Sequence, residues 1–205
     1  FDFPVKPDFG CPMLWVDLSS SNLRRCFSNN TYQVKYCNNG TKRAENAYVL
    51  LDLDDFLTPL NASLPYTNLG NGVLRFEVGD LEVGECGWFH LFFKVNCDAA
   101  LSQTHCTEAH IYPDQNCLPV NPLWSGASLR LSSTCQSDSL RFTIENAGSG
   151  NMTNTSNYIV IEDQVMLMSA PVLLDAGESV TVSVPANGST WRMELVQVPY
   201  HPGHS

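Results

Sequence analysis

Residues 32–40 read YQVKYCNNG and residues 140–148 read LRFTIENAG, so an alternating run ends in an Asn-x-Gly turn twice in this chain. Each turn is followed downstream by a Leu-x-x-Gly-Glu motif, LEVGE at 81–85 and LDAGE at 174–178, and then by a second apolar run. Self-similarity on this scale is typical of modular architectures. The sequence therefore predicts two related domains in tandem.

Alternation of apolar and polar residues indicates that the repeated runs are β-strands. Successive side chains of a strand point to opposite faces, so a half-buried antiparallel strand shows a period of two. Clusters such as Asn-Gly and Gly-Ser-Gly between the runs supply the positive φ angles of tight turns. Helical periodicity is almost absent, and one short helical turn is expected at 98–103. The clearest alternating segments are 32–36, 74–78, 140–144, 180–184 and 191–195.

Many short, one-sided strands predict an all-β fold in which antiparallel sheets bury their apolar faces against each other as sandwiches. With 205 residues, 43% of them hydrophobic, the chain is long enough for two such cores. Pro119 and Pro122 mark the boundary, because two prolines this close cannot both lie in a central strand. The predicted organisation is an extension or linker at 1–10, a first domain at 11–118, a linker at 119–122, and a shorter second domain with a C-terminal tail at 123–205.

Cysteine usage predicts disulfides and thus an oxidising compartment. No Cys-x-x-Cys occurs, and the shortest gaps are too long for a zinc knuckle. Only one cysteine follows the boundary, so either Cys135 bonds across the domains or two thiols stay unpaired. The pairing itself stays open, because eight cysteines allow many connectivities. The disulfide candidates are Cys11, Cys26, Cys37, Cys86, Cys97, Cys106, Cys117 and Cys135.

The charge balance argues against several classes of protein. Charged residues make up only 16% of the chain, and the formal net charge is -10. A nucleic-acid surface needs clustered Lys and Arg, and anionic membranes attract basic segments. The apolar stretches are shorter than the roughly 18 residues of a membrane helix. We expect no nucleic-acid partner and no membrane insertion, and any secretion signal to have been removed or to lie outside this sequence.

The densest group of potential catalytic or metal-binding side chains is His105, Cys106, Glu108 and His110. A Cys-His pair can activate a thiolate nucleophile. In an alternating strand, however, His105 faces away from the other three, and Cys106 is expected in a disulfide. No oxyanion hole or orienting partner is evident. No catalytic residue is assigned, and the protein is predicted not to be an enzyme.

Three carboxylates, Asp52, Asp54 and Asp55, follow the run at 49–51 and are candidate calcium ligands. Calcium binds carboxylate oxygens and stiffens extracellular modules, but this spacing is not that of an EF-hand loop. The alternative is that these acids are simply solvated and aid solubility. No other cofactor is predicted.

Aromatic residues suggest an alternative function. Pyranose rings stack on flat aromatic side chains, so exposed rings on one sheet face would indicate a carbohydrate-binding module. Trp88 and Trp191 begin alternating strands and are expected in the cores, while Trp124 is expected between the domains. The full set is Trp15, Trp88, Trp124, Trp191, Tyr48, Tyr66 and Tyr112.

The N-terminal run FDFPV is a candidate subunit-contact strand, in which Phe1, Phe3 and Val5 alternate with Asp2 and Pro4. Such a segment adds to an exposed sheet edge in some extracellular fibres. The alternative is a linker from a preceding domain. Under the first interpretation, neighbouring copies form a homo-oligomer or filament.

Two kinds of glycosylation signal are present, and the sequence leaves open whether either is used. One is the three-residue run Asp138-Ser139-Leu140, which resembles an O-glycosylation signal. The other is the Asn-x-Ser/Thr sequon, which starts at Asn29, Asn39, Asn61, Asn151, Asn154 and Asn187.

Segments 32–40, 47–53 and 74–95 resemble a repeat domain of many bacterial surface proteins, which is catalogued only as a domain of unknown function. The cysteine-rich variant, with Cys86 directly after Gly84-Glu85, is similar to domains in very long surface proteins of the Bacteroidota. The resemblance covers most of the first domain and, more weakly, part of the second. It implies an immunoglobulin-like fold, export, and a role in adhesins or surface fibres, and it does not imply catalysis. Cys135 departs from the pattern.

The predicted function is a structural or adhesive module of an extracellular surface fibre, appendage or large adhesin, built of two disulfide-braced immunoglobulin-like sandwiches. Its expected partners are neighbouring copies of the same protein and a cell-surface or glycan target. The alternatives are a carbohydrate-binding module and an accessory domain of a secreted enzyme.

Overall fold

The computed structural model describes residues 10–101, 103–114, 119–136 and 138–203, and over these residues the chain is all-β. None of the described residues is helical, so none forms a helix that could span a membrane. In place of the helical turn expected at 98–103 there are two hydrogen-bonded turns. The N–H of Ala99 donates to the C=O of Asn96, and that of Gln103 to the C=O of Ala100, both at 3.3 Å.

The strands form two compact units, each with its own core. The first unit contains the described residues up to Ala99 together with those from Thr107 to Asp114; the second contains Ala100–Cys106 and the residues from Pro119 onward. This division differs from the expected first domain, 11–118, in the segment Ala100–Cys106. The segment Ala100–Cys106 belongs to the second unit because Cys106 forms a disulfide with Cys135.

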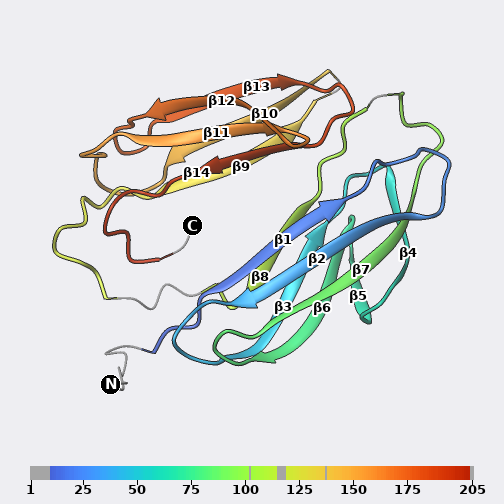
Figure 1. The fold of residues 1–205 in the computed structure, drawn as a ribbon, viewed down its shortest axis with the longest axis horizontal. Helices are drawn as coiled ribbons and strands as arrows, with labels where there is room; N and C mark the ends of the chain where they lie inside the picture. Colours follow the sequence, from blue (N-terminus) through green and yellow to red (C-terminus); the bar gives the residue numbers. More distant parts are fainter. Residues whose placement is uncertain (1–9, 102, 115–118, 137, 204–205) are drawn as a thin grey trace. The chain divides into compact units, whose positions relative to one another are not determined.

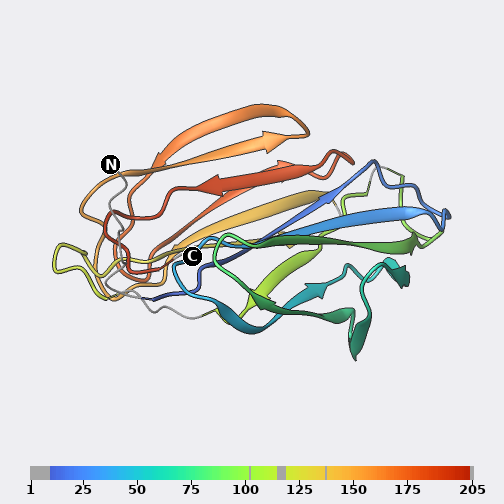
Figure 2. The same cartoon turned by 60° about the horizontal axis from the view of Figure 1, so that its bottom comes forward.

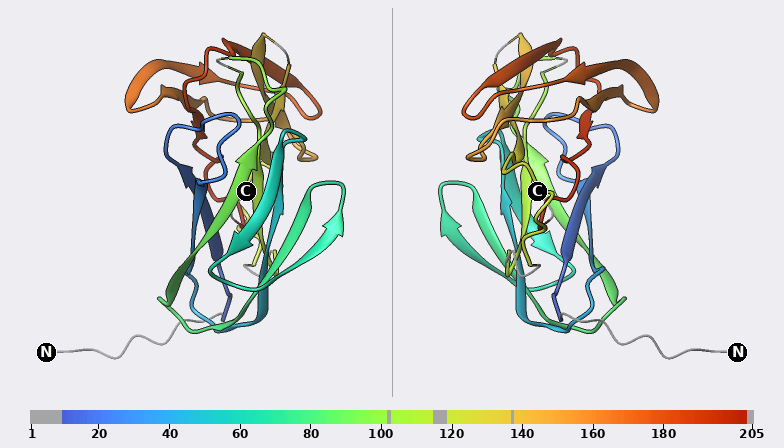
Figure 3. Two further views of the ribbon diagram at one scale, coloured as in Figure 1. Left: turned by 90° about the vertical axis from the view of Figure 1, so that its right-hand side faces the viewer. Right: turned by 90° about the vertical axis from the view of Figure 1, so that its left-hand side faces the viewer.

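The first unit is a sandwich of two four-stranded antiparallel sheets (Figure 1). Figure 3 shows β1 and β2 (blue) on one side of this unit and the β5–β6 hairpin (turquoise) on the other. One sheet has the order β1-β2-β7-β4, formed by Leu14–Ser20, Asn30–Asn38, Cys86–Val95 and Leu57–Ala62. The other has the order β5-β6-β3-β8, formed by Tyr66–Gly70, Val73–Leu81, Ala44–Asp52 and Glu108–Tyr112.

The core of the first unit lies between its sheets, because alternate residues of each strand face inward. Phe76 of β6 stacks on Phe89 of β7, with ring centroids 4.3 Å apart, and so joins the two sheets. Burial of each such side chain stabilises the fold by about 2 kcal/mol. The other large, fully buried side chains here are Val34, Val49, Leu51, Leu74, Leu91, Phe93 and Val95.

The second unit is a smaller sandwich of two three-stranded antiparallel sheets (Figures 1 and 2). Its core includes Leu129, Ile144 and Val160. The predicted all-β fold of disulfide-braced sandwiches is therefore confirmed. One sheet has the order β13-β10-β9, formed by Ser179–Pro185, Ser139–Asn146 and Leu129–Cys135, and the other has the order β12-β11-β14, formed by Val165–Val172, Ser156–Glu162 and Trp191–Leu195.

The two units share a plan of six strands. In one sheet the first strand pairs with the second, and the second pairs with the strand that follows the Gly-Glu turn, giving β1-β2-β7 and β9-β10-β13. In the other sheet the third strand lies between the fourth and the last, giving β6-β3-β8 and β12-β11-β14. The first unit adds β4 beside β7 and β5 beside β6. The two Asn-x-Gly motifs thus lie at equivalent places.

Disulfides brace both units. In the first, Cys26 bonds Cys97 and Cys37 bonds Cys86. In the second, Cys135 bonds Cys106. This bond crosses the predicted boundary at 119–122 in the sequence, but both cysteines belong to the second unit, so it does not join the two units. Cys11 is also disulfide-bonded, and no cysteine among the described residues is free, while Cys117 lies outside them. This pattern indicates an oxidising environment, as is usual for extracellular proteins.

Candidate functional sites

A buried asparagine ends the second strand of each unit and connects four backbone groups. Asn38, at the end of β2, has no exposed surface. Its side-chain oxygen accepts the backbone N–H groups of Met13 (3.2 Å) and Gly40 (3.0 Å). Its amide nitrogen donates to the C=O groups of Lys42 (2.8 Å) and Leu81 (3.0 Å). The side chain thus ties the first strand, the turn and the end of β6 together.

Asn146, at the end of β10, makes the same four contacts in the second unit and is also fully buried. Its oxygen accepts from Ser128 (3.0 Å) and Gly148 (3.1 Å), and its nitrogen donates to Gly150 (2.9 Å) and Leu174 (3.3 Å). A carboxylate has no donor, so aspartate cannot replace either residue without losing two bonds. We refer to Asn38 and Asn146, with these contacts, as the asparagine brackets.

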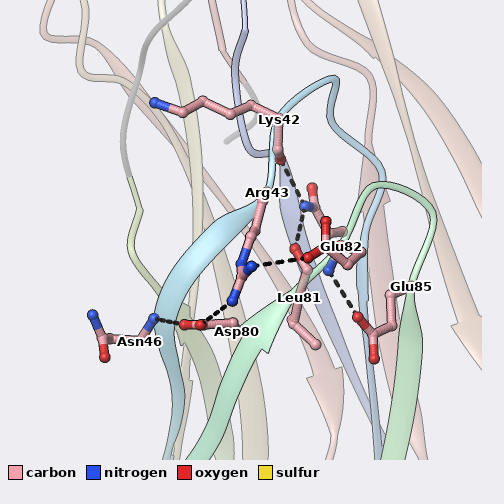
Figure 4. A network of polar contacts seen from close by, with 8 residues as sticks. Lys42, Arg43, Asn46, Asp80, Leu81, Glu82 and Glu85 are labelled. Carbon is pink, nitrogen blue, oxygen red and sulfur yellow. Dashed lines mark hydrogen bonds and ion pairs between the residues drawn. The ribbon is translucent and has the colours of Figure 1, made fainter.

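The Leu-x-x-Gly-Glu motif forms the turn that faces each bracket. Gly84 has a φ of 78°, a left-handed conformation that favours glycine, and its N–H donates to the C=O of Asn38 at 2.8 Å. The carboxylate of Glu85 accepts the N–H of Glu82 at 2.8 Å, which closes the turn (Figure 4). Gly177 has the same φ and donates to Asn146 at 2.9 Å. The repeated motifs are therefore folding elements.

An ion network lies on the surface beside the first bracket (Figure 4). Arg43 pairs with Asp80 and, at 3.1 Å, with Glu82. The second carboxylate oxygen of Asp80 accepts the backbone N–H of Asn46 at 2.8 Å. This N–H and, next, Arg43 hold the pKa of Asp80 below its usual value. Because all of these side chains are largely exposed, the network contributes little to stability.

The candidate calcium ligands are not gathered into a metal site. Asp52 ends β3, and Asp54 uses a carboxylate oxygen to accept the backbone N–H of Phe56 at 3.0 Å, which shapes the turn before β4. Asp55 is exposed. Over the residues that the structure describes, no three His, Cys, Asp or Glu side chains are placed to hold a metal ion.

The group around Cys106 is arranged differently from the expected alternating strand. β8 begins only at Glu108, so His105 and Cys106 precede it and the alternation argument does not apply to them. Cys106 is half of a disulfide and therefore offers no thiolate. His110 instead approaches Asp114, with Nε2 and Oδ2 3.1 Å apart. These residues do not form a catalytic pair.

Residues near the C-terminus belong to the second unit rather than to a free tail. The His201 Nε2 lies 3.0 Å from the hydroxyl of Ser128, and its ring meets Trp124 edge-on at 5.5 Å. Trp124, expected between the domains, packs against the core of the second unit and donates its indole N–H to the C=O of Ala127 at 2.8 Å. The described part of the expected tail therefore contacts the second unit through His201.

The largest correction concerns Trp88, which was expected in the core. Phe89 and the alternate residues after it face the core, so Trp88, His90 and Phe92 of β7 face outward. Trp88 is 60% exposed and Phe92 is 37% exposed. His90 lies between them, with its ring 5.0 Å from that of Trp88. The β7 strand therefore presents an aromatic row to solvent.

A second tryptophan lies on the same outer face. Trp15 of β1 is 40% exposed, and the Lys35 amine lies 5.9 Å from the centroid of its ring. In the strand register, Lys35 is opposite Asp17 on one side and Trp88 on the other. The outer face of the β1-β2-β7 sheet thus combines two exposed indoles with a lysine between them. We call Trp15, Lys35 and Trp88 the indole face.

The tyrosines of the opposite sheet are covered by neighbours. Tyr48 and Tyr112 stack on each other, with centroids 4.9 Å apart and planes 16° apart, and Arg75 lies 3.6 Å above the Tyr48 ring. Tyr66 packs against Phe76 at 5.5 Å. The chain's own side chains pack against all three rings, which reduces the surface on which a sugar could stack.

Two further features were not expected from the sequence. One is a clamp on the pair of central strands β2 and β7: Cys37–Cys86 joins directly opposite residues at one end, and Cys26–Cys97 joins the segments just beyond the other end. The other is a run of four exposed apolar residues on β12, Val165 to Met168. The N-terminal candidates Phe1, Phe3 and Val5 lie outside the described residues.

A scan of the sequence against protein-family models finds no match, and a search of curated protein sequences finds none either. The assignment to an immunoglobulin-like surface repeat therefore stays a prediction, based on the residues that suggested it.

Proposed function

We propose that this chain is a non-enzymatic structural and adhesive module of an extracellular surface protein, such as a fibre, an appendage or a large adhesin. The observation that carries the proposal is the pair of disulfides at both ends of the β2–β7 ladder. These strands form the centre of their sheet, and bonds at both ends prevent them from separating under load. A module that transmits force needs this property.

The asparagine brackets support the same function. Each bracket lies where three segments of the chain meet, so its four hydrogen bonds must break before the second strand can leave the sheet. Buried bonds of this kind resist local opening. The second unit carries its own disulfide, which joins Cys106 to the end of β9. Both units are thus built against local unfolding, as a surface module requires.

Immunogold electron microscopy of intact cells that produce the protein tests the location and the assembly together. We expect an antibody against the chain to label structures outside the cell, and protease treatment of intact cells to remove the label. Labelling that is seen only after permeabilisation would contradict the proposal. Isolation of the chain as part of a longer secreted polypeptide with a catalytic domain would favour the accessory-domain alternative.

Single-molecule pulling tests the mechanical role. We expect the oxidised protein to survive loads that unfold the variant in which Cys26, Cys37, Cys86 and Cys97 are all replaced by alanine. The matched control is removal of the Cys106–Cys135 bond, which leaves the first unit clamped. Equal lifetimes of the oxidised protein and the four-cysteine variant under load would exclude a load-bearing role for the clamp.

The indole face favours a second candidate function, the binding of a glycan. Exposed indoles present apolar faces that stack on pyranose rings, and Lys35 between them adds a cation that suits an acidic sugar. We expect a glycan array to identify an acidic ligand. Calorimetry should then show an affinity at least tenfold lower for Trp88→Ala, but an unchanged affinity for Tyr200→Ala, a control aromatic that is 54% exposed. Absence of glycan binding, or equal binding by both variants, would exclude this function.

A further inference from the structure

Among the described residues, no strand pairs with the outer edge of β12, whereas β5 covers the equivalent edge of β6 in the first unit. β6 and β12 occupy the same position in the six-strand plan. β5 pairs with β6 in antiparallel register, but β11 is the one strand beside β12 among the described residues (Figure 2). An open edge presents unpaired backbone N–H and C=O groups to any strand that approaches it. The first unit therefore shows that this position accepts another strand.

The side chains along the open edge are unusually apolar. Four consecutive residues are exposed: Val165 (66%), Met166 (61%), Leu167 (55%) and Met168 (38%). The register with β11 shifts within this run, where Val160 is opposite Met168 and Ile161 is opposite Met166, so Leu167 is the extra residue of a β-bulge. Apolar side chains are exposed on both sides of this bulge. Flexible methionines are common in surfaces that adapt to a partner. A contiguous apolar patch of this kind marks an interaction site.

Charge favours a second copy of the same strand as the partner. Residues 164–174 contain no charged side chain, although the chain carries a net charge of -10. Two β12 strands can therefore meet without placing like charges opposite each other. The other end strands of this unit, β13, β9 and β14, are less suitable, because each exposes polar or charged residues. These are Ser179, Thr181 and Ser183 of β13, Arg130 of β9, and Arg192 and Glu194 of β14. Apolar β12 is best matched by itself.

We propose that β12 is a homotypic docking strand, to which β12 of a second copy adds in antiparallel orientation. The arrangement has two-fold symmetry, so each copy contributes the same surface and the contact closes as a dimer. The docking strand rests on the proposed surface role for its biological meaning, because a second copy is the partner through which such surface modules join. One strand pair is smaller than a standard interface of about 800 Å² per partner, so we expect a weak association that is detected at high protein concentration.

Sedimentation velocity of the 205-residue chain from about 5 to 500 µM tests the association. We expect a concentration-dependent dimer. With the run Val165–Met168 of one copy opposite the same run of the other, Met166→Lys places two lysines near each other and should weaken association at least tenfold. The matched control is Val83→Lys on the first unit, where the valine is 55% exposed, and it should associate like the unmodified chain. A chain that stays monomeric at the highest concentration overturns the proposal, as does equal association of both variants.

Charge rescue distinguishes docking from a folding defect. An equal mixture of Met166→Lys and Met166→Glu should recover association that neither variant shows alone, while both retain the circular dichroism melt of the unmodified chain. Failure to recover association overturns the edge pairing. The immunogold experiment is independent of this result. A monomeric chain found on the cell surface overturns only the docking strand, and a dimeric chain found inside the cell overturns only the surface role.

Discussion

The two units differ at one pair of opposite residues next to the asparagine bracket. In the first unit Cys37 and Cys86 face each other across β2 and β7 and are bonded. In the second unit the same register position holds Glu145 and Ser179, which face each other across β10 and β13. Both units nevertheless have the same six-strand plan and the same bracket. The plan therefore depends on the bracket and the core, and the cross-strand disulfide is an addition to it.

A second difference concerns the edges. The first unit covers β7 with β4 and β6 with β5, while in the described part of the second unit no strand covers the outer edges of β13 and β12. Covered edges resist pairing with other chains, and open edges permit it. The first unit thus covers two strands that lie at the sheet edges in the second unit, and its own edges are formed by β1, β4, β5 and β8.

Replacement of either bracket should cause the largest loss of stability. Asn38→Ala or Asn146→Ala leaves four backbone groups without partners, two N–H and two C=O, so we expect each to cost about 4 kcal/mol. Hydrogen exchange with mass spectrometry measures this separately in each unit. The loss should be confined to the unit that carries the substitution.

The matched control is Asn39→Ala, which changes the exposed neighbour of Asn38 in the same turn and should cost less than about 0.5 kcal/mol. If Asn38→Ala and Asn146→Ala differed by more than about 2 kcal/mol, the two brackets would not be equivalent, and a shared plan would not explain them.

Removal of the cross-strand disulfide should have the next largest effect. Cys37 and Cys86 are 49 residues apart, and loss of a bond that closes such a loop costs about 4 kcal/mol in the chain-entropy description. Because this loop lies inside the one closed by Cys26–Cys97, the unfolded chain is already restricted, and we expect about 3 kcal/mol for the double variant C37A/C86A. Urea denaturation measures it. A loss below about 1 kcal/mol would mean that the bond serves a role other than stability.

The reverse substitution sharpens the comparison. Glu145→Cys together with Ser179→Cys recreates the pair in the second unit, where the two residues are already directly opposite. We expect the disulfide to form spontaneously and to stabilise that unit by about 2 kcal/mol, less than a native bond because geometry is not optimised. Mass spectrometry detects the bond, and hydrogen exchange measures the gain. Unpaired thiols in the folded double variant would show that the strands are spaced differently in the two units.

The alternation of residues was sufficient to predict the all-β sandwich, because a period of two leaves few other ways to bury one face of a strand. The same alternation failed for Trp88, because it fixes which residues share a face but not which face is inside. Phe89 and Trp88 are both large and apolar, and only packing against Phe76 of the other sheet decides between them. The indole face could therefore be predicted only by knowing which face of β7 packs against the second sheet.

Contacts between residues far apart in the chain could also not be predicted from the sequence. The brackets were visible as Asn-x-Gly motifs, but their partners Met13 and Leu81 lie 25 and 43 residues from Asn38. The group at His105 and Cys106 was misread as a strand, because the disulfide to Cys135 places that segment in the other unit. The open edge of β12 follows from the absence of an added strand in the second unit, which no local pattern reveals.

Alkaline pH should weaken the first unit selectively through Tyr32. Burial raises the pKa of Tyr32 to about 12, and its hydroxyl lies 3.1 Å from that of Thr107. Because the pKa of Tyr32 is raised in the folded state, the stability that its protonated hydroxyl contributes is fully present below the pKa of the unfolded chain, near 10. This contribution is lost as the pH rises through 12. At pH 11 the loss is about 1.4 kcal/mol. The equivalent residue of the second unit is Leu140, which does not titrate.

Urea denaturation at pH 8 and pH 11 measures this effect, with Tyr32→Phe as the control. The variant should lose less stability between the two pH values than the unmodified chain, by about 1.4 kcal/mol. Equal losses would show that the Tyr32 hydroxyl reaches water when it ionises.

Acid should produce the smallest difference between the units, through Asp80. The N–H of Asn46 and, secondarily, Arg43 lower the pKa of Asp80, so the stability it supplies is present above the ordinary carboxylate pKa and is lost as the pH falls through the lowered value. Leu173 holds the equivalent position in the second unit and is 58% exposed. A carbon-detected NMR titration should find the pKa of Asp80 below its usual range. Because the backbone N–H is the larger cause, Arg43→Gln should return that pKa only part of the way. A complete return would mean that Arg43 alone lowers the pKa of Asp80. The loss of stability of the first unit in acid would then come from a surface ion pair rather than from the backbone N–H of Asn46 in β3.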